Sequence, residues 1–390
     1  MKIAHIISTF PPYKGGMGNV VYYSAREMAR LGHHNVIFTP AYDKKDAGRE
    51  KLEDNLEVVR LSSFFSIGNA AVLPSLIWKL RGFDIIHLHY PFYGSGEMVL
   101  LGLIFSQAKF MIHYHMDTVA KGLKGLIFRM YAFFVLPIIV RFAKVITCAS
   151  LDYVKHSEIK DYYSSHISRF IQIPFGVDTK QFTPGEKSEN PIILFVGGLD
   201  HQHNFKGVEQ LIDAFALITK QYPLARLCIV GRGDLEDYYR GRIASHQLGE
   251  KASIMNSVSD IQLADLFKSA WVTVLPSTNR AEAFGLVLLE SLASGTAVIA
   301  SNLAGVRNVF QNGEQGYLVK AGDVVDLAQK LKKIVSNKEN AVRLGTAGRT
   351  WVDEQYSWKE FSQRLEAAYS RVLYVPRKLS EASLDSQEDD

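Results

Sequence analysis

Short apolar runs alternate with longer amphipathic stretches along most of this chain. The apolar runs are bounded by Gly, Pro or polar residues, which is typical of buried parallel strands. They occur at residues 2–8, 35–39, 56–61, 85–88, 110–112, 144–150, 192–196, 226–230, 271–275 and 296–300. Helical patterns lie between them, for example at 19–31, 208–218 and 262–269. This alternation predicts a doubly wound α/β protein, in which helices connect parallel strands.

The length of the chain indicates two domains. With 390 residues, it exceeds the size at which one hydrophobic core usually keeps growing. A polar stretch at 183–191 contains two prolines and a glycine and separates the two groups of strands. We interpret this stretch as an interdomain linker.

The cysteines and the N-terminus favour a cytoplasmic protein. Cys148 and Cys228 lie far apart in apolar runs and have no metal-ligand spacing, which is typical of buried thiols in a reducing compartment. No cleavable signal pattern is found, because only residues 3–9 are apolar before Pro11 and Pro12.

The charge is distributed unevenly between the two halves. Residues 1–180 contain 21 Lys and Arg against 14 Asp and Glu, a net charge of +7, whereas the remainder has 23 against 26, a net charge of −3. The basic first half favours an anionic partner, either a membrane surface or a pyrophosphate group. No basic run is dense enough to indicate a nucleic acid.

Three glycines follow the first predicted strand. Gly15, Gly16 and Gly18 stand at the turn into a helix, where backbone N–H groups can approach a phosphate closely. Their spacing is not the Gly-x-Gly-x-x-Gly pattern, and Pro40 rather than an acid follows the next strand, so a dehydrogenase is disfavoured. The glycines predict either a phosphate site or a turn without a ligand.

Two acids follow the strand at 271–275. Glu282 lies in the polar loop after this strand, and Glu290 lies eight residues later in a helix that stops at Gly295. Both carboxylates can face the carboxyl end of the sheet, where open α/β sheets bind ligands. Without its context, this spacing favours an ordinary pair of acids: one solvated acid beside a helix end and one within the helix.

The context of these acids carries a family resemblance. Backbone N–H groups near Phe284, Gly285 and Leu286 would form an anion site at the helix N-terminus. Glu282-x7-Glu290, with Phe284-Gly285 inside it, resembles the Glu-x7-Glu motif of the retaining family 4 glycosyltransferases. The resemblance implies the GT-B fold, in which two Rossmann-like domains face each other across a cleft.

The resemblance also implies roles for the motif residues. Glu282 would lie beside the donor sugar, and Glu290 would bind the ribose of the nucleotide. The glycines at positions 15, 16 and 18 would meet the donor diphosphate. No metal is expected, because Lys206 and the helix N-termini would stabilise the departing diphosphate.

A second phosphate site is implied at the start of the second domain. Lys206-Gly207 resembles the family's Lys-Gly pair, but Gly198 stands where the family usually has Arg. The donor pyrophosphate would thus lose a bidentate cation. Gly231 begins a Gly-x-Gly loop that resembles the one beside the nucleotide base. Candidates to replace the missing charge are His201, His203, Arg280 and backbone amides.

Histidines gather at two neighbouring strand ends. His115 and Asp117 match the family's His-x-Asp variant, which implies that His115 approaches the donor sugar and the reaction centre. The alternative is a loop histidine with satisfied hydrogen bonds. That alternative is the preferred interpretation for His87, His89 and His113.

The segment 121–144 combines apolar and basic residues. Arg129, Pro137 and Arg141 interrupt its apolar runs, which leaves each run shorter than the roughly 20 residues of a membrane span. No acid occurs between Asp117 and Asp152. The segment predicts either a helix at an anionic bilayer surface or a buried helix with basic ends in water.

We therefore expect a retaining, metal-independent hexosyltransferase that uses a GDP- or UDP-linked sugar and a glycan or lipid-linked acceptor, in surface polysaccharide or glycolipid synthesis. The alternatives are a sugar-nucleotide epimerase or hydrolase of the same fold and a noncatalytic membrane-surface subunit of a polysaccharide assembly complex. The expected location is cytoplasmic, with peripheral contact at the inner face of the membrane. The expected domains are 1–182, the linker 183–191, 192–356, a helix at 357–375 that crosses back to the first domain, and a disordered acidic tail at 376–390.

Overall fold

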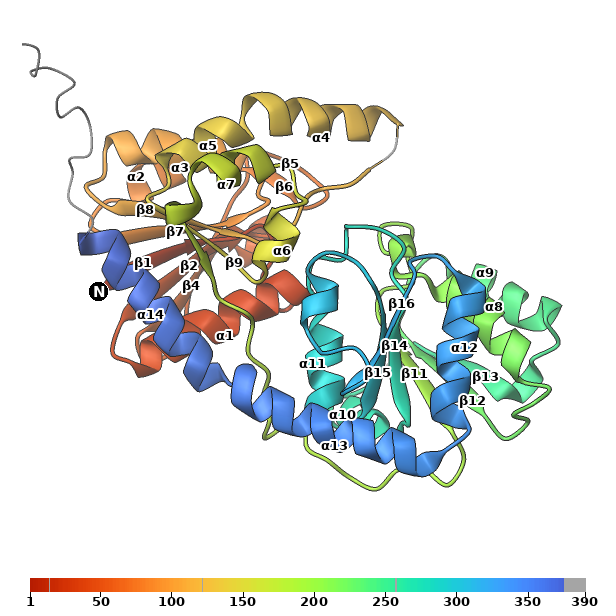
Figure 1. The fold of residues 1–390 in the computed structure, drawn as a ribbon. Coiled ribbons are helices and arrows are strands. Elements are labelled where there is room, and N and C mark those ends of the chain that lie inside the picture. Colours follow the sequence, from red (N-terminus) through yellow and green to blue (C-terminus); the bar gives the residue numbers. More distant parts are fainter. Residues whose placement is uncertain (14, 121, 257, 375–390) are drawn as a thin grey trace, which may run out of the picture.

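The computed structural model describes residues 1–13, 15–120, 122–256 and 258–374. Its two α/β halves each consist of one sheet with helices on both faces (Figure 1). This is the doubly wound GT-B architecture that the sequence predicts. The acidic tail predicted at 376–390 lies outside the described residues.

The N-terminal sheet has eight strands in the order β10-β9-β8-β7-β1-β2-β4-β3. Its strands pair in parallel except for the edge strand β3, which is antiparallel to β4. A separate hairpin consists of β5 and β6. The strands are β1 (Lys2–Ile6), β2 (His34–Pro40), β3 (Gly48–Glu53), β4 (Leu56–Leu61), β5 (Phe65–Ile67), β6 (Ala70–Val72), β7 (Ile85–Tyr90), β8 (Lys109–Tyr114), β9 (Val145–Cys148) and β10 (Phe170–Gln172).

The C-terminal sheet has six parallel strands in the order β13-β12-β11-β14-β15-β16. Its middle strands are buried and aliphatic because helices cover both faces. The strands are β11 (Ile192–Val196), β12 (Arg226–Val230), β13 (Ala252–Met255), β14 (Val272–Leu275), β15 (Ala297–Ser301) and β16 (Gly316–Val319).

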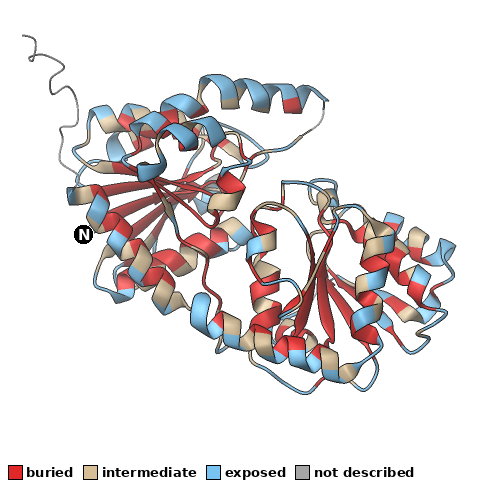
Figure 2. Cartoon of the chain, in the orientation of Figure 1, coloured by how far each residue is buried: buried red, intermediate tan, exposed pale blue. Residues whose placement is uncertain are grey.

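Helices pack against the buried sheet of each domain (Figure 2). In the N-terminal domain they are α1 (Gly16–Arg30), α2 (Leu76–Lys79), α3 (Ser95–Ile104), α4 (Gly122–Phe134), α5 (Leu136–Phe142), α6 (Leu151–Val154) and α7 (Lys160–Ser165). In the C-terminal domain they are α8 (Val208–Ile218), α9 (Glu236–Ser245), α10 (Asp260–Ser269), α11 (Leu286–Ala293) and α12 (Val324–Val335).

Two final helices tie the domains together. Helix α13 (Lys338–Gln355) packs on the C-terminal domain, and α14 (Trp358–Tyr374) runs back along the N-terminal domain (Figure 1). Tyr369 of α14 is fully buried there and forms a hydrogen bond with His87 of β7. One apolar cluster consequently contains residues of both sheets and of α14.

Two predicted helices differ from the structure. The first helix begins at Gly16 rather than at residue 19, so Gly16 and Gly18 belong to its first turn. The segment 121–144 forms two helices, because the chain breaks at Val135 just before Pro137. Both cysteines are buried free thiols, as predicted.

Candidate functional site

Lys206 and Glu282, which are expected at the donor site, lie in contact. Lys206 Nζ is 2.8 Å from Glu282 Oε2, and Ser277 Oγ donates to the same oxygen at 3.2 Å. The loops that carry them pack directly together, because Thr278 N–H donates to the carbonyl of Phe205 at 2.7 Å. Both charges are largely shielded from solvent, so their interaction is stronger than that of a surface pair.

The backbone beside Glu282 turns sharply into α11. Gly285 is the N-cap residue and has φ +87°, a conformation that favours glycine. The N–H groups of Phe284, Gly285 and Leu286 have no hydrogen-bond partner among the described residues. These N–H groups thus remain available to an anion, as predicted for a helix N-terminus.

The Phe284 side chain is not part of this anion site. It is buried and packs edge-on against Phe175, with ring centroids 5.1 Å apart, and against Tyr356 at 6.3 Å. Phe284 therefore anchors the motif at the junction of the domains, and only its backbone is available to a ligand.

The glycines of α1 lie opposite the motif. A Cβ on Gly16 would be 3.5 Å from Leu286, the first residue of α11. A Cβ on Gly18 would lie 2.8 Å from the carbonyl oxygen of Thr9, so only glycine fits at that close approach. The N-terminal ends of α1, preceded by Gly15, and of α11 therefore meet across the domain boundary.

Glu290 lies in the second turn of α11 and is only partly exposed. Burial raises the pKa of its carboxyl to about 7, with the charge of Asp260 as a second cause. Hydrogen-bond donors from a ligand stabilise the ionised form of a carboxylate in such surroundings, and the hydroxyls of a ribose would supply such donors.

Close backbone packing explains the glycines of the C-terminal domain. A Cβ on Gly231 would come within 1.9 Å of the Gly197 carbonyl, and one on Gly197 would meet the Lys206 side chain at 2.9 Å. The absence of side chains lets Lys206 cross the end of β11 toward Glu282.

The space beside Gly198 is occupied by a histidine. A Cβ on Gly198 would lie 2.6 Å from His203 Nδ1, and this nitrogen is 2.8 Å from Asp200 Oδ2. Of the other candidates, His201 pairs with Asp234 at the surface. The His203 ring therefore fills the space beside Gly198 and is paired with Asp200.

Arg280, the remaining candidate, faces the other domain. Its Nε is 3.5 Å from Asp117 Oδ2, and its guanidinium is 4.0 Å from Glu158. Burial raises the pKa of Asp117, and burial together with Asp117 raises the pKa of Glu158 to about 7. Arg280 thus links the His-x-Asp loop to the loop that carries Glu282.

His115 is buried at the carboxyl end of β8, two residues before Asp117. Its Nε2 is 3.1 Å from His89 Nδ1, and its ring stacks on Phe175 with centroids 5.9 Å apart. Phe175 also contacts Phe284, so His115 lies one ring away from the motif of the C-terminal domain.

Sequence reasoning missed a second interdomain contact. Arg307 donates two hydrogen bonds to Asp152 of α6, at 2.8 and 2.6 Å, and the N–H of Gly305 donates a third at 3.0 Å. Tyr153 adds another, because its hydroxyl donates to the Arg280 carbonyl at 3.1 Å. Neither periodicity nor a motif could find these pairs, since the partners are more than a hundred residues apart.

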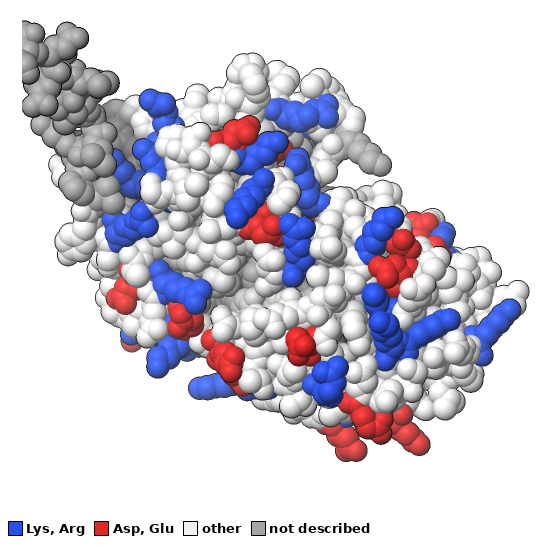
Figure 3. Space-filling model, viewed as in Figure 1, with Lys and Arg blue, Asp and Glu red and all other residues white. Residues whose placement is uncertain are grey.

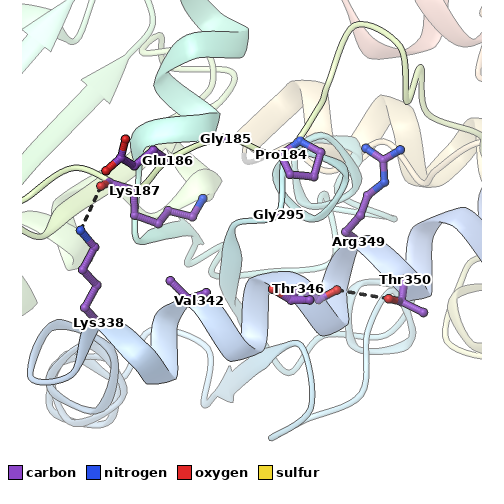
Figure 4. A pocket seen from close by; sticks show the side chains of 10 residues that line it. All are labelled: Pro184, Gly185, Glu186, Lys187, Gly295, Lys338, Val342, Thr346, Arg349 and Thr350. Atoms are coloured by element: carbon purple, nitrogen blue, oxygen red, sulfur yellow. Dashed lines mark hydrogen bonds between the residues drawn. The ribbon is translucent and has the colours of Figure 1, made fainter.

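One cavity lies away from this site. It has a volume of about 440 Å³ and lies between the linker and α13 (Figure 4). Its cations already have partners: Lys187 donates to the Lys268 carbonyl and to Thr296, Lys338 to the Lys187 carbonyl, and Arg349 to the Ala293 carbonyl. Those bonds fasten the linker to the C-terminal domain, so this cavity is a packing feature.

The fold and the paired motif define a glycosyltransferase of the GT-B architecture. Two family models match the chain: Glycosyltransferase Family 4 over residues 14–181 and Glycosyl transferases group 1 over residues 177–351. The chain belongs to the family 4 glycosyltransferases, as its Glu-x7-Glu motif predicts.

Curated relatives match over nearly the whole length. A phosphatidyl-myo-inositol mannosyltransferase of Mycobacterium tuberculosis is 28% identical and is aligned over 98% of this chain and 100% of its own. A D-inositol 3-phosphate glycosyltransferase of Corynebacterium aurimucosum is 24% identical over 93% and 92%.

Solved structures share the fold. A sucrose-phosphate synthase from Thermosynechococcus elongatus superimposes with a TM-score of 0.79 at 24% identity, over 95% of this chain and 98% of its own. Anabaena HepE in complex with UDP has a TM-score of 0.71 at 16% identity, over 95% and 100%.

Proposed function

We propose that this protein transfers a hexose, with retention at the anomeric carbon, from a nucleoside diphosphate sugar to a hydroxyl of a lipid-linked acceptor. The observation that carries the proposal is the shielded Lys206–Glu282 pair beside the unpaired N–H groups at the start of α11. This arrangement offers positive charge to a diphosphate and a carboxylate to the sugar attached to it.

The reaction breaks the bond between C1 of the sugar and the diphosphate oxygen and forms a bond from C1 to the acceptor oxygen. The proton of the acceptor hydroxyl leaves with the diphosphate. Lys206, the N-terminus of α11 and the opposing N-terminus of α1 stabilise the charge that develops on this leaving group. Glu290 accepts from the ribose hydroxyls, and Glu282 and His115 contact the sugar.

The lipid-linked acceptor is proposed from the surface of α4 and α5. Of the residues in α4, only Gly125 is buried, so a buried helix is the wrong alternative for this part of the segment (Figure 2). The segment Gly122–Phe142 is long and apolar enough to cross a membrane by length and composition, and 22% of an apolar 18-residue window within it is buried. Large apolar side chains stand exposed along it: Leu123, Leu126, Ile127, Met130, Phe133, Phe134, Ile138 and Phe142.

Charge and packing favour a helix pair that lies flat on an anionic bilayer. The exposed basic residues are Lys124, Arg129, Arg141 and Lys144, and basic side chains lie across this face of the N-terminal domain (Figure 3). Helix α5 keeps Leu136, Ile139 and Val140 in the core of the domain. Insertion as a span would expose that core, whereas surface binding would bury only the apolar face of α4.

A ligand panel tests the activity. Thermal unfolding is measured with GDP, UDP and ADP and with their sugar derivatives, because a ligand stabilises the protein according to its concentration relative to Kd. We expect one nucleoside diphosphate to raise Tm, and its sugar derivative to release it only when acceptor is present. Turnover without an acceptor would indicate an epimerase or hydrolase, and no stabilisation by any nucleotide would indicate a noncatalytic subunit.

Vesicle flotation tests the membrane contact. The protein should float with phosphatidylglycerol vesicles and less with pure phosphatidylcholine, and the double variant Leu126→Glu, Phe133→Glu should stay at the bottom. Ile261→Glu is the control, since Ile261 is an apolar residue exposed on α10 of the other domain. Equal flotation of the double variant and the control would contradict binding through α4.

A further inference from the structure

Five histidines are buried together in the N-terminal sheet. His5 lies on β1, His87 and His89 lie on β7, and His113 and His115 lie at the end of β8, with 0 to 8% of each residue exposed. The strand register pairs His5 with His87 and His89 with His113. All five therefore project from one face of the sheet.

Three hydrogen bonds join some of these histidines into a chain that ends at His115. Asn35 Oδ1 is 3.1 Å from His5 Nε2, His5 Nδ1 is 3.2 Å from His89 Nε2, and His89 Nδ1 is 3.1 Å from His115 Nε2. Beyond Asn35 the chain is anchored, because Asn35 Nδ2 donates to the carbonyl of His33 at 2.7 Å.

This anchor sets the direction of every bond in the chain. The Asn35 amide nitrogen serves the carbonyl, so its oxygen faces His5 and accepts from Nε2–H. A neutral imidazole has one donor and one acceptor nitrogen. His5 Nδ1 therefore accepts from His89 Nε2–H, and His89 Nδ1 accepts from His115 Nε2–H.

We infer that Asn35, His5 and His89 are positioning residues that hold His115 as the Nε2–H tautomer, with the lone pair of Nδ1 available to a sugar hydroxyl. Burial keeps the chain neutral, since it lowers the pKa of His5 to about 4 and those of His89 and His115 well below the usual value. The inference rests on the proposed function for the contact between His115 and the donor sugar.

The open end of the chain is on the ligand side. Among the described residues, Nδ1 of His115 has no hydrogen-bond partner, and it is not among the fully buried unpaired atoms, unlike Nε2 of His87 and of His113. An Nδ1 lone pair accepts a hydrogen bond from a hydroxyl, whereas the opposite tautomer would present an N–H there. The chain thus decides whether His115 accepts or donates.

A metal is the competing occupant of this cluster. One ring nitrogen each of His5, His87 and His89 lies within 4.8 Å of the others. However, both nitrogens of His5 and of His89 are engaged in the chain, so a metal would have to break it. Metal content is therefore one of the measurements that decide between the two.

The direct test is the tautomer of His115 in the wild-type protein. Long-range ¹H–¹⁵N spectra of protein labelled at histidine distinguish a protonated from an unprotonated ring nitrogen, and His115→Gln assigns the signals. We expect Nε2–H and an unprotonated Nδ1 at neutral pH. Nδ1–H, a doubly protonated ring, or a metal that copurifies in one equivalent and is ligated by His5 and His89 would overturn the inference.

Variants at the far end of the chain separate positioning from packing. Asn35→Leu removes the terminal acceptor and should give a mixture of His115 tautomers and lower kcat/KM about tenfold, as expected for one lost hydrogen bond. Asn35→Gln keeps an uncharged amide acceptor and should retain more of the Nε2–H tautomer than Asn35→Leu. An unchanged His115 spectrum in Asn35→Leu would contradict the inference.

Thr147→Val is the matched control. Thr147 is equally buried, and its hydroxyl lies 3.0 Å from His113 Nδ1, outside the chain. The variant should leave the spectrum of His115 and kcat/KM unchanged, and a shift as large as that of Asn35→Leu would show a general packing effect instead. If the wild type transferred no sugar from any nucleotide, the proposed function would fall, while the spectrum would still decide the tautomer.

Discussion

The two domains have the same layered architecture but bury different chemistry in their central strands. In the C-terminal sheet, β11, β14 and β15 are apolar except for Thr273 and Ser301. In the N-terminal sheet, β1, β7 and the end of β8 bury imidazoles. Buried polar groups cost free energy unless they are hydrogen-bonded. The chain from Asn35 to His115 supplies such bonds to His5, His89 and His115, whereas Nε2 of His87 and of His113 has no partner among the described residues.

The difference teaches how each domain contributes to one site. The C-terminal domain presents unpaired backbone N–H groups before α11, beside the side chains of Lys206, Glu282 and Glu290, and its glycines let loops approach closely. In our proposal the N-terminal domain presents the His115 side chain, whose tautomer is set through a chain of hydrogen bonds that ends at Asn35. Variants should therefore fail in different ways in the two domains.

The largest effect is expected at the Lys206–Glu282 pair. Glu282→Ala removes the carboxylate beside the sugar and leaves Lys206 partly buried without its partner, so kcat/KM should fall about 10²- to 10³-fold. Steady-state kinetics with the identified donor measure this loss. Glu314→Ala, at an exposed acid of the same domain, is the control, and a loss of only a few fold in Glu282→Ala would refute the assigned role.

The backbone character of the C-terminal site is tested at Gly231. A Cβ there would lie 1.9 Å from the Gly197 carbonyl, so Gly231→Ala must shift the loop after β12 or that after β11. The free energy of unfolding should fall by about 3 kcal/mol, and the nucleotide should bind more weakly. Urea unfolding and calorimetric titration measure the two effects.

Gly241→Ala provides the matched comparison. Gly241 lies within α9, and no atom lies within 4 Å of a Cβ built there. Alanine has the better helix propensity, so this variant should be stabilised by about 0.5 to 1 kcal/mol. If both variants behaved alike, close backbone approach would not explain Gly231.

The fold and the C-terminal motif could be predicted from the sequence more fully than the residues that contact the motif. Strand-helix alternation and Glu282-x7-Glu290 are local patterns, and the structure has both the sheets and the motif where they were expected. The assignment of Glu282, Lys206, Glu290 and His115 to the donor stays a prediction, as do the domain boundaries. Gly16 and Gly18 were placed in a loop because glycine disfavours helices, but here close packing overrides that propensity.

Contacts between distant residues were beyond sequence reasoning. His87, His89 and His113 were interpreted as histidines with satisfied hydrogen bonds, which is wrong for Nε2 of His87 and of His113. Nothing in their spacing shows that His5 bonds His89 and that Asn35 bonds His5. The register of four neighbouring strands, β2, β1, β7 and β8, creates that chain. Likewise, the position of the His203 ring beside Gly198 follows from the fold of a loop.

A smaller effect is expected from the pH dependence of nucleotide binding. Burial raises the pKa of Glu290 to about 7. The free energy of unfolding of the free protein therefore falls as the pH rises from the ordinary pKa of a Glu carboxyl toward 7. Ribose hydroxyls donate best to the ionised carboxylate. Affinity should therefore rise by up to about tenfold per unit below pH 7 and level off above it.

Glu290→Gln separates this effect from the titration of the nucleotide itself. Calorimetric titrations from pH 6 to pH 8.5 should give a steeper affinity profile for the wild type than for the variant, because the phosphate titrates in both. Parallel profiles would mean that Glu290 does not contact the ribose as a carboxylate.

The smallest effect is expected at the interdomain contact around Asp152. Asp152 accepts two hydrogen bonds from Arg307 and one from the Gly305 N–H; burial would raise its pKa, but these donors lower it overall. Asp152→Ala should loosen the contact and raise KM for the donor two- to fivefold with kcat nearly unchanged, since a partly exposed pair stabilises by about 1 kcal/mol at most. Asp353→Ala removes a pair of similar length within α13 and should leave KM unaltered. If Asp152→Ala lowered kcat as strongly as a change at Glu282, the interdomain contact would belong to the catalytic machinery. The two domains would then not contribute to the site in the separate ways described above.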